Sequence, residues 1–490
     1  MRFKIRPILK DISFTFITEA IILLTFFVIY RLVAKNFGPK GIGEYTLIRR
    51  IVGFLSPILL LGIGIGMPRY IAISKDEKQR SAYIKTGASI VIIFTFIFLL
   101  FANLFKIQFT KIFFRFPYYV NFVLPSSFFI FGFVSHTLLY SYFRGRLLIK
   151  TLNCFQIINI ALVPLLILLF IKTIRIAGLI SLIGISNIVI TGIFFMFFIN
   201  EFFIHGEKGQ LRECLKELVS YSFPRVFGDF AFFGLLSLGP IIAVHFVSIQ
   251  EVGYLSISQS LLSAAGSAMA PLGIIILPKV SSLIREGREK TIKENLVFFL
   301  ASIFHLSIFV SIQLIIFADF IVKYWLGADF LDAVPVLRSI FVSIMFFVFY
   351  IGMRNILDAV AIKPLNTINL FVSLGIFLLS TPMLLCIFKF FVPIVNLGIA
   401  FSFSVICLGI LTYFPIIKIN QEVQKKWTNN LLEVIIINIL LHIVAILSKP
   451  FLIYSYRFVI FEIFLFILYF SILWSLKIEW LRQIPKIIKA

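Results

Sequence analysis

The sequence has few charged residues for its length. Only 14% of its 490 residues are charged, whereas 60% are hydrophobic and the mean hydropathy is +1.06. Soluble domains contain about 25% charged and 45–50% apolar residues, so this composition excludes a soluble globular protein. Apolar windows of about 20 residues, long enough to cross a bilayer as helices, recur along the chain. The sequence therefore predicts an all-α polytopic membrane protein.

Cysteines, clustered histidines and long polar loops are also scarce. The four cysteines have no metal-ligand or redox spacing, and the histidines are isolated from one another. No loop is long enough to fold as a catalytic domain. We therefore expect no catalytic residues, no metal and no cofactor, and we place the functional residues within the membrane or at its faces.

The basic residues are unevenly distributed. The chain has 45 Lys and Arg against 22 Asp and Glu, a balance that in a soluble protein would suggest nucleic acid. Here the basic residues lie mainly in short loops, so we expect no nucleic-acid partner. The apolar run at 12–33 is too long for the core of a signal peptide and is interrupted by Glu19, so we interpret it as an uncleaved first helix.

Fourteen apolar segments of spanning length can be placed along the chain. Their approximate ranges are 12–34, 45–66, 84–105, 119–142, 152–171, 177–199, 220–246, 250–277, 296–318, 334–357, 366–388, 394–416, 431–447 and 457–475. Alternate loops carry 29 and 12 basic residues, and the other four lie inside spans. The positive-inside rule then places both termini in the cytoplasm of a multi-pass protein of the cell (inner or plasma) membrane.

The chain contains an internal repeat with an offset of 210 residues. Gly43 aligns with Gly253, Pro68 with Pro278, Glu19 with Asp229, Tyr140 with Tyr350 and Arg144 with Arg354. The repeat contains an even number of spans, so the two copies are parallel. We predict a six-helix lobe at 1–218, a second at 219–418, and two additional helices with a cytoplasmic tail at 419–490. Such two-lobe repeats are typical of transporters.

Several stretches resemble a known family. A basic N-terminus and a long first helix precede FGPKGIGEYTLI, a proline-interrupted second helix that ends in GIGIGMPRYIA, and an RGRLLIK loop after the fourth span. This order resembles the polysaccharide-biosynthesis flippases of the multidrug/oligosaccharidyl-lipid/polysaccharide exporter superfamily. The resemblance implies a V-shaped pair of lobes around a central cavity that opens alternately to the two membrane faces.

The resemblance also implies a cargo and a function. The cargo would be an undecaprenyl-pyrophosphate-linked oligosaccharide, such as an O-antigen, capsule or exopolysaccharide repeat unit, flipped from the cytoplasmic to the outer leaflet. We expect a monomer among membrane lipids, with a polysaccharide polymerase and assembly proteins as further partners, and no enzymatic activity. Two alternatives stay open: a multidrug or cation antiporter on the same fold, and a membrane polysaccharide polymerase or ligase.

Charged residues inside the spans are the candidate site, because charge within a membrane helix is costly. Arg49 and Arg50 could bind the lipid pyrophosphate, since Arg matches phosphate oxygens bidentately. The alternative is that they snorkel to outer headgroups. In the second repeat copy they align with Gln259 and Ser260, so the pair belongs to one lobe only, which favours a one-sided substrate contact.

Four further residues complete the predicted site. Arg225 and Asp229 are four residues apart, so they share a helix face and can pair with each other. Arg225 and Arg338 are candidate substrate ligands, although Arg338 can also snorkel near the outer end of its span. Asp229 and its repeat equivalent Glu19 are candidates for binding a coupling proton or Na⁺, with a hydrogen bond to a neighbouring helix as the alternative.

Overall fold

The chain forms helices throughout the part that the structure describes. The computed structural model describes residues 5–171, 174–203, 208–267, 289–360, 364–388, 390–418, 431–449 and 455–475, and within these ranges it has no strand. The all-α prediction is confirmed. Contacts divide the chain into two compact units, unit 1 (Met1–Ile257) and unit 2 (Ser258–Ala490). Unit 1 extends beyond the predicted first lobe of 1–218, and the three predicted domain ranges stay a prediction.

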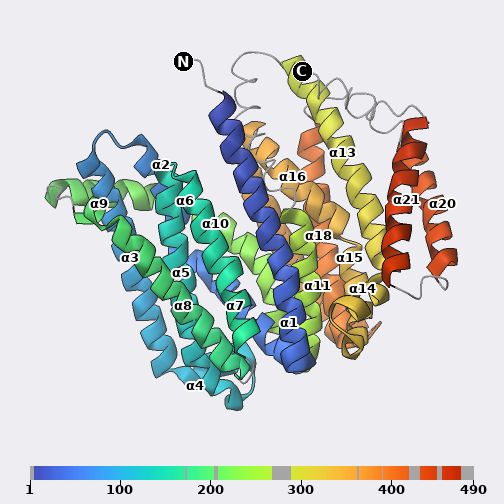
Figure 1. Cartoon of the computed structure of the whole chain (residues 1–490), viewed down its shortest axis with the longest axis horizontal. Helices are drawn as coiled ribbons and strands as arrows, with labels where there is room; N and C mark the ends of the chain where they lie inside the picture. The colour runs from blue at the N-terminus through green and yellow to red at the C-terminus, as the bar shows by residue number, and fades with distance from the viewer. Residues whose placement is uncertain are drawn as a thin grey trace. The chain divides into compact units, whose positions relative to one another are not determined.

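The first helix, α1 (Ile5–Leu60), contains the first predicted span and residues 45–60 of the second, and it breaks between them. Gly38 has a φ of 65° and a ψ of −169°, and Pro39 follows it. A straight helix of 56 residues would be about 84 Å long, far more than the hydrocarbon core of about 30 Å. Gly38 adopts the left-handed φ at no steric cost. The next helix, α2 (Ile63–Ile73), lies at the end of the unit where the N-terminus is found (Figure 1), so the second arm of α1 runs back.

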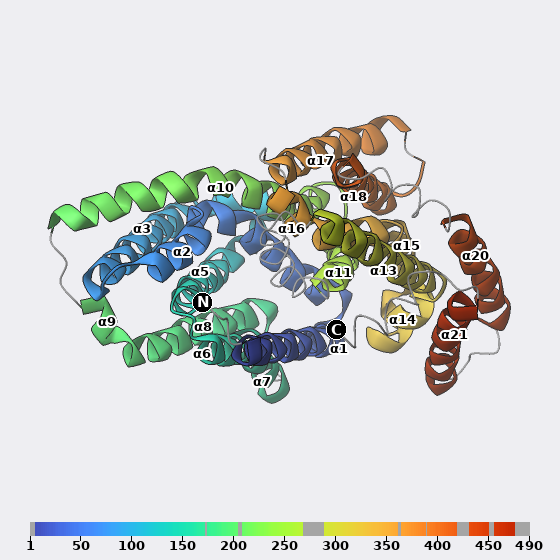
Figure 2. The same cartoon turned by 90° about the horizontal axis from the view of Figure 1, so that it is seen from above.

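The rest of unit 1 is a bundle of helices with close backbone contacts. A Cβ on Gly132 would lie 2.6 Å from the Gly184 carbonyl oxygen, so a larger residue would push the two helices apart. Figure 2 shows the bundle from above. The elements are α3 (Glu77–Leu104), α4 (Lys106–Phe114), η1 (Pro117–Phe122), α5 (Val123–Gly145), α6 (Ile149–Gln156), the π-helical η2 (Ile157–Leu162), α7 (Val163–Phe170), α8 (Ile176–Phe197), α9 (Ile199–Phe203), α10 (Lys208–Ala243) and α11 (Ile249–Ser267), whose last ten residues belong to unit 2.

Unit 2 is built from shorter and more often interrupted helices. Its elements are α13 (Glu289–Ile316), α14 (Ala318–Trp325), η3 (Ala328–Ala333), α15 (Val334–Phe341), α16 (Ile344–Val360), α17 (Leu365–Pro382), the π-helical η4 (Met383–Phe388), α18 (Pro393–Lys418), α20 (Leu431–Ser448) and α21 (Ser455–Ser475). The last two pack on α13 through a buried apolar cluster that includes Phe309, Leu441 and Tyr469. Burial of this cluster anchors the C-terminal helices to unit 2.

The helices are suited to a membrane by length and composition. Among the described residues, eight helices are long and apolar enough to cross a membrane, or ten if each of two bent pairs counts as one span, and α20 and α21 contain shorter apolar helices. The count takes α1 as one helix, although it holds the first predicted span and most of the second. The last ten residues of the predicted span 250–277 lie outside the described residues. Large apolar side chains such as Phe96, Phe170 and Phe197 are 62–80% exposed, as expected for surfaces that face lipid.

The repeat-related glycines Gly43 and Gly253 meet in space. A Cβ on Gly253 would lie 2.9 Å from the Cα of Gly43, and a Cβ on Gly43 would lie 1.9 Å from the Ile249 carbonyl oxygen. The second arm of α1 therefore crosses the start of α11 with direct backbone contact, which only glycine allows. This crossing brings the arginine-bearing arm against the first residues of α11.

Candidate functional site

The Arg49–Arg50 pair lies deep along the second arm of α1. The arm begins directly after the break at Gly38, six residues before the predicted span, so Arg49 is about 15 Å along the axis from Pro39. Both arginines are half-buried. At this depth, about half the thickness of the hydrocarbon core, a guanidinium needs polar partners within the protein.

The partners of Arg49 are two buried tyrosines of α1. Its Nη1 donates a hydrogen bond to the Tyr45 hydroxyl at 3.2 Å. Its guanidinium carbon lies 5.8 Å from the Tyr30 ring centroid and 5.6 Å from the Tyr45 centroid, within the range of cation–π attraction. The two rings are 6.0 Å apart and nearly perpendicular, so a rigid aromatic wall positions the cation.

Arg50 points to a different helix. Its Nη2 donates to the backbone carbonyl oxygen of Ser256 on α11 at 2.8 Å. Ser256 is fully buried, and a helical carbonyl has a second lone pair that can accept this bond. Arg50 therefore links the two helices just beyond the Gly43–Gly253 crossing, and its direction is fixed by the packing of unit 1.

The Arg49 guanidinium is held by a neutral acceptor and two aromatic rings. Within the described ranges, no carboxylate lies within 4.0 Å of the Arg49 guanidinium. Arg stays protonated at any relevant pH, and a tyrosine hydroxyl or a peptide carbonyl satisfies its geometry without cancelling its charge. The arrangement therefore favours a bound anion, and phosphate oxygens match the planar donor fork of Arg.

Glu19 lies within a polar cluster in the interior of unit 1. Its Oε1 accepts a hydrogen bond from Gln156 Nε2 at 3.2 Å, and one turn away Asn153 Nδ2 donates to Thr15 Oγ1 at 3.2 Å. The donors come from α6, directly before the π-helical turn η2, a feature often found at functional sites. Glu19 thus has the hydrogen-bonded neighbour that the sequence analysis left open, and its carboxylate remains half-buried.

Arg225 and Asp229, the second predicted pair, lie on α10. Arg225 is exposed and its Nη1 donates to the Tyr221 carbonyl oxygen at 2.6 Å. Its guanidinium carbon stacks 3.5 Å from the centroid of the Tyr221 ring. Asp229 is half-buried. The structure thus directs Arg225 to Tyr221, one turn earlier on the same helix.

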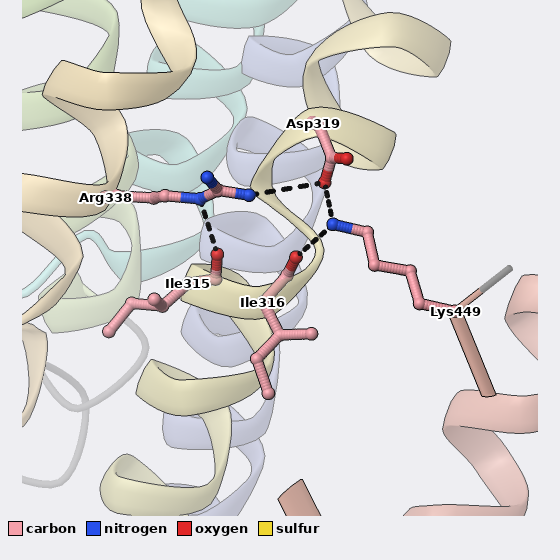
Figure 3. A network of polar contacts seen from close by, with 5 residues as sticks. All are labelled: Ile315, Ile316, Asp319, Arg338 and Lys449. Atoms are coloured by element: carbon pink, nitrogen blue, oxygen red, sulfur yellow. Dashed lines mark hydrogen bonds and ion pairs between the residues drawn. The ribbon is translucent and has the colours of Figure 1, made fainter. Parts of the chain in front are cut away.

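Arg338, on α15, belongs to a network at a sharp break in unit 2. α13 and α14 meet at 71°, which leaves the last carbonyls of α13 without helical partners. Arg338 Nε donates to the Ile315 oxygen at 3.1 Å, and Lys449 Nζ donates to the Ile316 oxygen at 2.9 Å. Both side chains also approach one oxygen of Asp319, at 3.8 Å and 2.8 Å (Figure 3).

The contacts of Arg338 suffice to explain its position structurally. Cations at a helix C-terminus and an acid in the first turn of the next helix are both favourable. Arg338, Lys449 and Asp319 supply these charges to α13 and α14 at the break. A substrate role for Arg338 stays a prediction.

Sequence reasoning missed the residues that hold the arginines. Tyr45 could have been found, because it lies four residues before Arg49 and so shares its helix face. Tyr30 and Ser256 could not, since they reach the pair only through the break in α1 and the crossing with α11. The four cysteines are free, and within the described residues no group of three or more His, Cys, Asp and Glu side chains could hold a metal.

The fold is that of a multi-pass helical membrane protein, and comparisons with known proteins refine this class. The profile of the polysaccharide biosynthesis protein family matches residues 8–284, which is more than half of the chain. The chain belongs to this family. No curated protein matches its sequence.

Solved structures share the fold at low sequence identity. The lipid II flippase MurJ in an inward closed conformation is 16% identical with a TM-score of 0.62, over 95% of this chain and 99% of that chain. An inward-facing multidrug resistance MATE family transporter of the MOP superfamily is 12% identical with a TM-score of 0.67, over 82% and 96%. A MOP superfamily transporter from Pyrococcus furiosus is 13% identical with a TM-score of 0.54, over 85% and 96%. At these identities the likeness establishes the fold alone.

Proposed function

We propose that the protein is a flippase that moves an undecaprenyl-pyrophosphate-linked oligosaccharide from the cytoplasmic to the outer leaflet by alternating access. The cargo would be an O-antigen, capsule or exopolysaccharide repeat unit. The observation that carries the proposal is the Arg49–Arg50 pair, deep in a membrane span and held by Tyr45, Tyr30 and the Ser256 carbonyl. Membership of the polysaccharide biosynthesis family and the fold shared with a lipid II flippase support it.

The pair is suited to a diphosphate on physical grounds. Each phosphate can accept two parallel hydrogen bonds from one guanidinium, and such charge-assisted bonds are about twice as strong as neutral ones. Arg49 lacks a carboxylate partner among the described residues, so the cargo would supply the missing negative charge. The prenyl chain would stay in lipid, and no bond would be made or broken.

The coupling site would be Glu19, with Asp229 as its repeat-related counterpart. Glu19 lies among amide and hydroxyl groups of unit 1, an environment in which a carboxylate can exchange a proton or bind Na⁺. Glu19→Gln keeps a hydrogen-bonding side chain but removes the charge. We expect it to abolish the dependence of transport on a proton or Na⁺ gradient in proteoliposomes. Unchanged gradient dependence would exclude Glu19 as the coupling residue.

A multidrug or cation exporter is the second candidate, because a MATE family transporter has the same fold. Such a function needs carboxylates where the cargo binds. The half-buried Arg49 and Arg50 oppose a cationic cargo, since like charges at close range cost several kcal/mol. If the purified protein transports a cationic dye in proteoliposomes and not a lipid diphosphate, this candidate replaces the first.

Deletion of the gene gives the direct cellular test. We expect lipid-linked repeat units to accumulate in the cytoplasmic leaflet of the cell membrane and surface polysaccharide to fall. Complementation by the wild-type protein should reverse both effects. Unchanged surface polysaccharide without accumulation would contradict the proposal. If the protein were instead a polymerase or a ligase, its deletion would leave lipid-linked units in the outer leaflet.

A further inference from the structure

A second arginine pair lies at the end of unit 1 where α2 is found. Arg69 of α2 and Arg225 of α10 both approach the ring of Tyr221, with their guanidinium carbons 4.2 Å and 3.5 Å from its centroid. Their separation cannot exceed the sum of these distances. Both side chains are exposed, so the pair presents two adjacent cations to its surroundings.

The Tyr221 ring is fixed by neighbouring aromatic side chains. The Tyr70 ring meets it nearly at right angles at 5.7 Å, and Tyr83 stacks on Tyr70 at 4.9 Å. The Tyr83 hydroxyl donates to the carboxylate of Glu217, which lies one turn before Tyr221 on α10. The Glu217 carboxylate is thus hydrogen-bonded to a neutral hydroxyl. The two arginines share the Tyr221 ring as a rigid support.

The arrangement leaves positive charge uncompensated. Within the described ranges, neither guanidinium has a carboxylate within 4.0 Å. Two other arginines do: Arg146 bonds Glu201 at 2.8 Å, and Arg338 lies 3.8 Å from Asp319. Two guanidinium groups on one ring repel each other, and an anion bound to both would turn that repulsion into attraction. The geometry is therefore that of an anion site.

The position of the pair indicates which anion would reach it. The sequence predicts that the loops at 69–85 and 208–216, near the two arginines, face the cytoplasm. The second arm of α1 continues for 11 residues beyond Arg49, about 16 Å, to Leu60, and Arg69 lies on α2 after the backbone break at Leu61 and Gly62. In the predicted orientation the Arg69–Arg225 pair therefore lies toward the cytoplasmic face, where a lipid headgroup of the cytoplasmic leaflet would first meet the protein.

We propose that Arg69 and Arg225 form a docking site for the diphosphate group of a lipid on the cytoplasmic side, used before the cargo reaches Arg49 and Arg50. This inference rests on the proposed function and adds a binding step to it. Two guanidinium groups around one ring can each take one phosphate of a diphosphate, whereas a monophosphate headgroup engages fewer donors. A diphosphate therefore fits the pair better than an ordinary phospholipid.

The test measures diphosphate binding to the full chain in phosphatidylcholine nanodiscs. Arg49→Ala with Arg50→Ala provides a background without the deeper pair, and farnesyl diphosphate and inorganic pyrophosphate are the probes in calorimetry. Adding Arg69→Ala and Arg225→Ala should weaken binding of both probes by about tenfold or more. Arg212→Ala, which removes an exposed arginine earlier on α10, should leave the affinity unchanged.

Tyr221 supplies a variant that keeps both charges. Tyr221→Phe retains the ring and should retain binding, whereas Tyr221→Leu removes the rigid support and should weaken it. A general loss of folding would affect the Phe and Leu variants alike and would also lower the melting temperature. A drop in affinity confined to the Leu variant, with the melting temperature retained, supports the docking site.

The possible outcomes separate this inference from the proposed function. Unchanged diphosphate affinity after loss of Arg69 and Arg225 would overturn the docking site. If that variant binds normally while Arg49→Ala with Arg50→Ala abolishes transport, the flippase stands without this step. If the end pair binds diphosphate but the wild-type chain moves no lipid-linked oligosaccharide, the docking site stands and the flippase does not.

Discussion

Arg49 in unit 1 and Arg338 in unit 2 lie inside predicted spans but have different surroundings. Arg49 contacts a hydroxyl and two aromatic rings. Arg338 bonds the end of α13 and shares Asp319 with Lys449 (Figure 3). In the first case the protein satisfies the hydrogen-bonding geometry of the cation but leaves its charge uncompensated. In the second case it satisfies the geometry and also compensates the charge.

The difference teaches how a charged residue within a membrane protein can be interpreted. Charge compensated by a carboxylate and by helix ends stabilises the fold and needs no ligand. Charge held by neutral groups on a rigid support is available to an anion. By this criterion Arg49 is the stronger substrate candidate and Arg338 the weaker one, although both are arginines in apolar segments.

The largest expected effect comes from the crossing that positions Arg50. A side chain at Gly43 would collide with the backbone of α11, because even a Cβ would lie 1.9 Å from the Ile249 oxygen. We expect Gly43→Leu to abolish the yield of monodisperse protein in size-exclusion chromatography. Gly375→Leu on α17 is the control, since nothing lies within 4 Å of a Cβ there. Equal yields of the two variants would show that the crossing is not needed.

An intermediate effect is expected from Tyr45→Phe, which removes the hydroxyl that accepts from Arg49 and keeps the ring. One hydrogen bond to a charged group contributes about 1.5–3 kcal/mol. We expect the KM for the lipid-linked substrate to rise by about tenfold in a proteoliposome assay, because Arg49 is less well positioned. The melting temperature should stay within a few degrees of wild type. A large fall in melting temperature would make Tyr45 a structural residue and weaken the contrast with Arg338.

The smallest effects are expected in unit 2, from the network around Asp319. Lys449→Ala removes bonds at 2.8 Å and 2.9 Å and should cost about 1 kcal/mol of stability. Arg338→Ala, whose ion pair is longer and partly exposed, should cost less than about 1 kcal/mol. Thermal unfolding in detergent measures both, and transport should stay within about threefold of wild type. Transport lost with Arg338→Ala at unchanged stability would restore it as a substrate residue.

The sequence predicts the local features of this fold well. Gly38 and Pro39 indicate the break in α1, because glycine allows a positive φ and proline cannot continue a helix. Apolar run length identifies the spans that the described helices occupy. The repeat marks Gly43 and Gly253 as special positions, and the structure adds that they face each other.

The tertiary partners of the charges could not be predicted. Arg50 bonds a residue 206 positions away, and no pattern within one helix encodes that contact. At the bend of 71° after α13, Arg338, Lys449 and Asp319 come together from three segments. Arg225 has a sequence neighbour, Asp229, that suggests a pair, but its guanidinium lies over Tyr221 instead. Periodicity gives the face of a helix, whereas the packing of the bundle decides what that face meets.

Translocation of a fluorescent undecaprenyl-diphosphate oligosaccharide by the purified protein in proteoliposomes tests the central claim most directly. The comparison is wild type, Arg49→Ala with Arg50→Ala, Arg49→Lys with Arg50→Lys, and Arg338→Ala. We predict a loss of about a hundredfold or more for the double Ala variant, partial activity for the double Lys variant, since Lys keeps the charge but loses the bidentate geometry, and near wild-type activity for Arg338→Ala. Translocation by the double Ala variant at the wild-type rate would contradict the assignment of Arg49 and Arg50 as the diphosphate site.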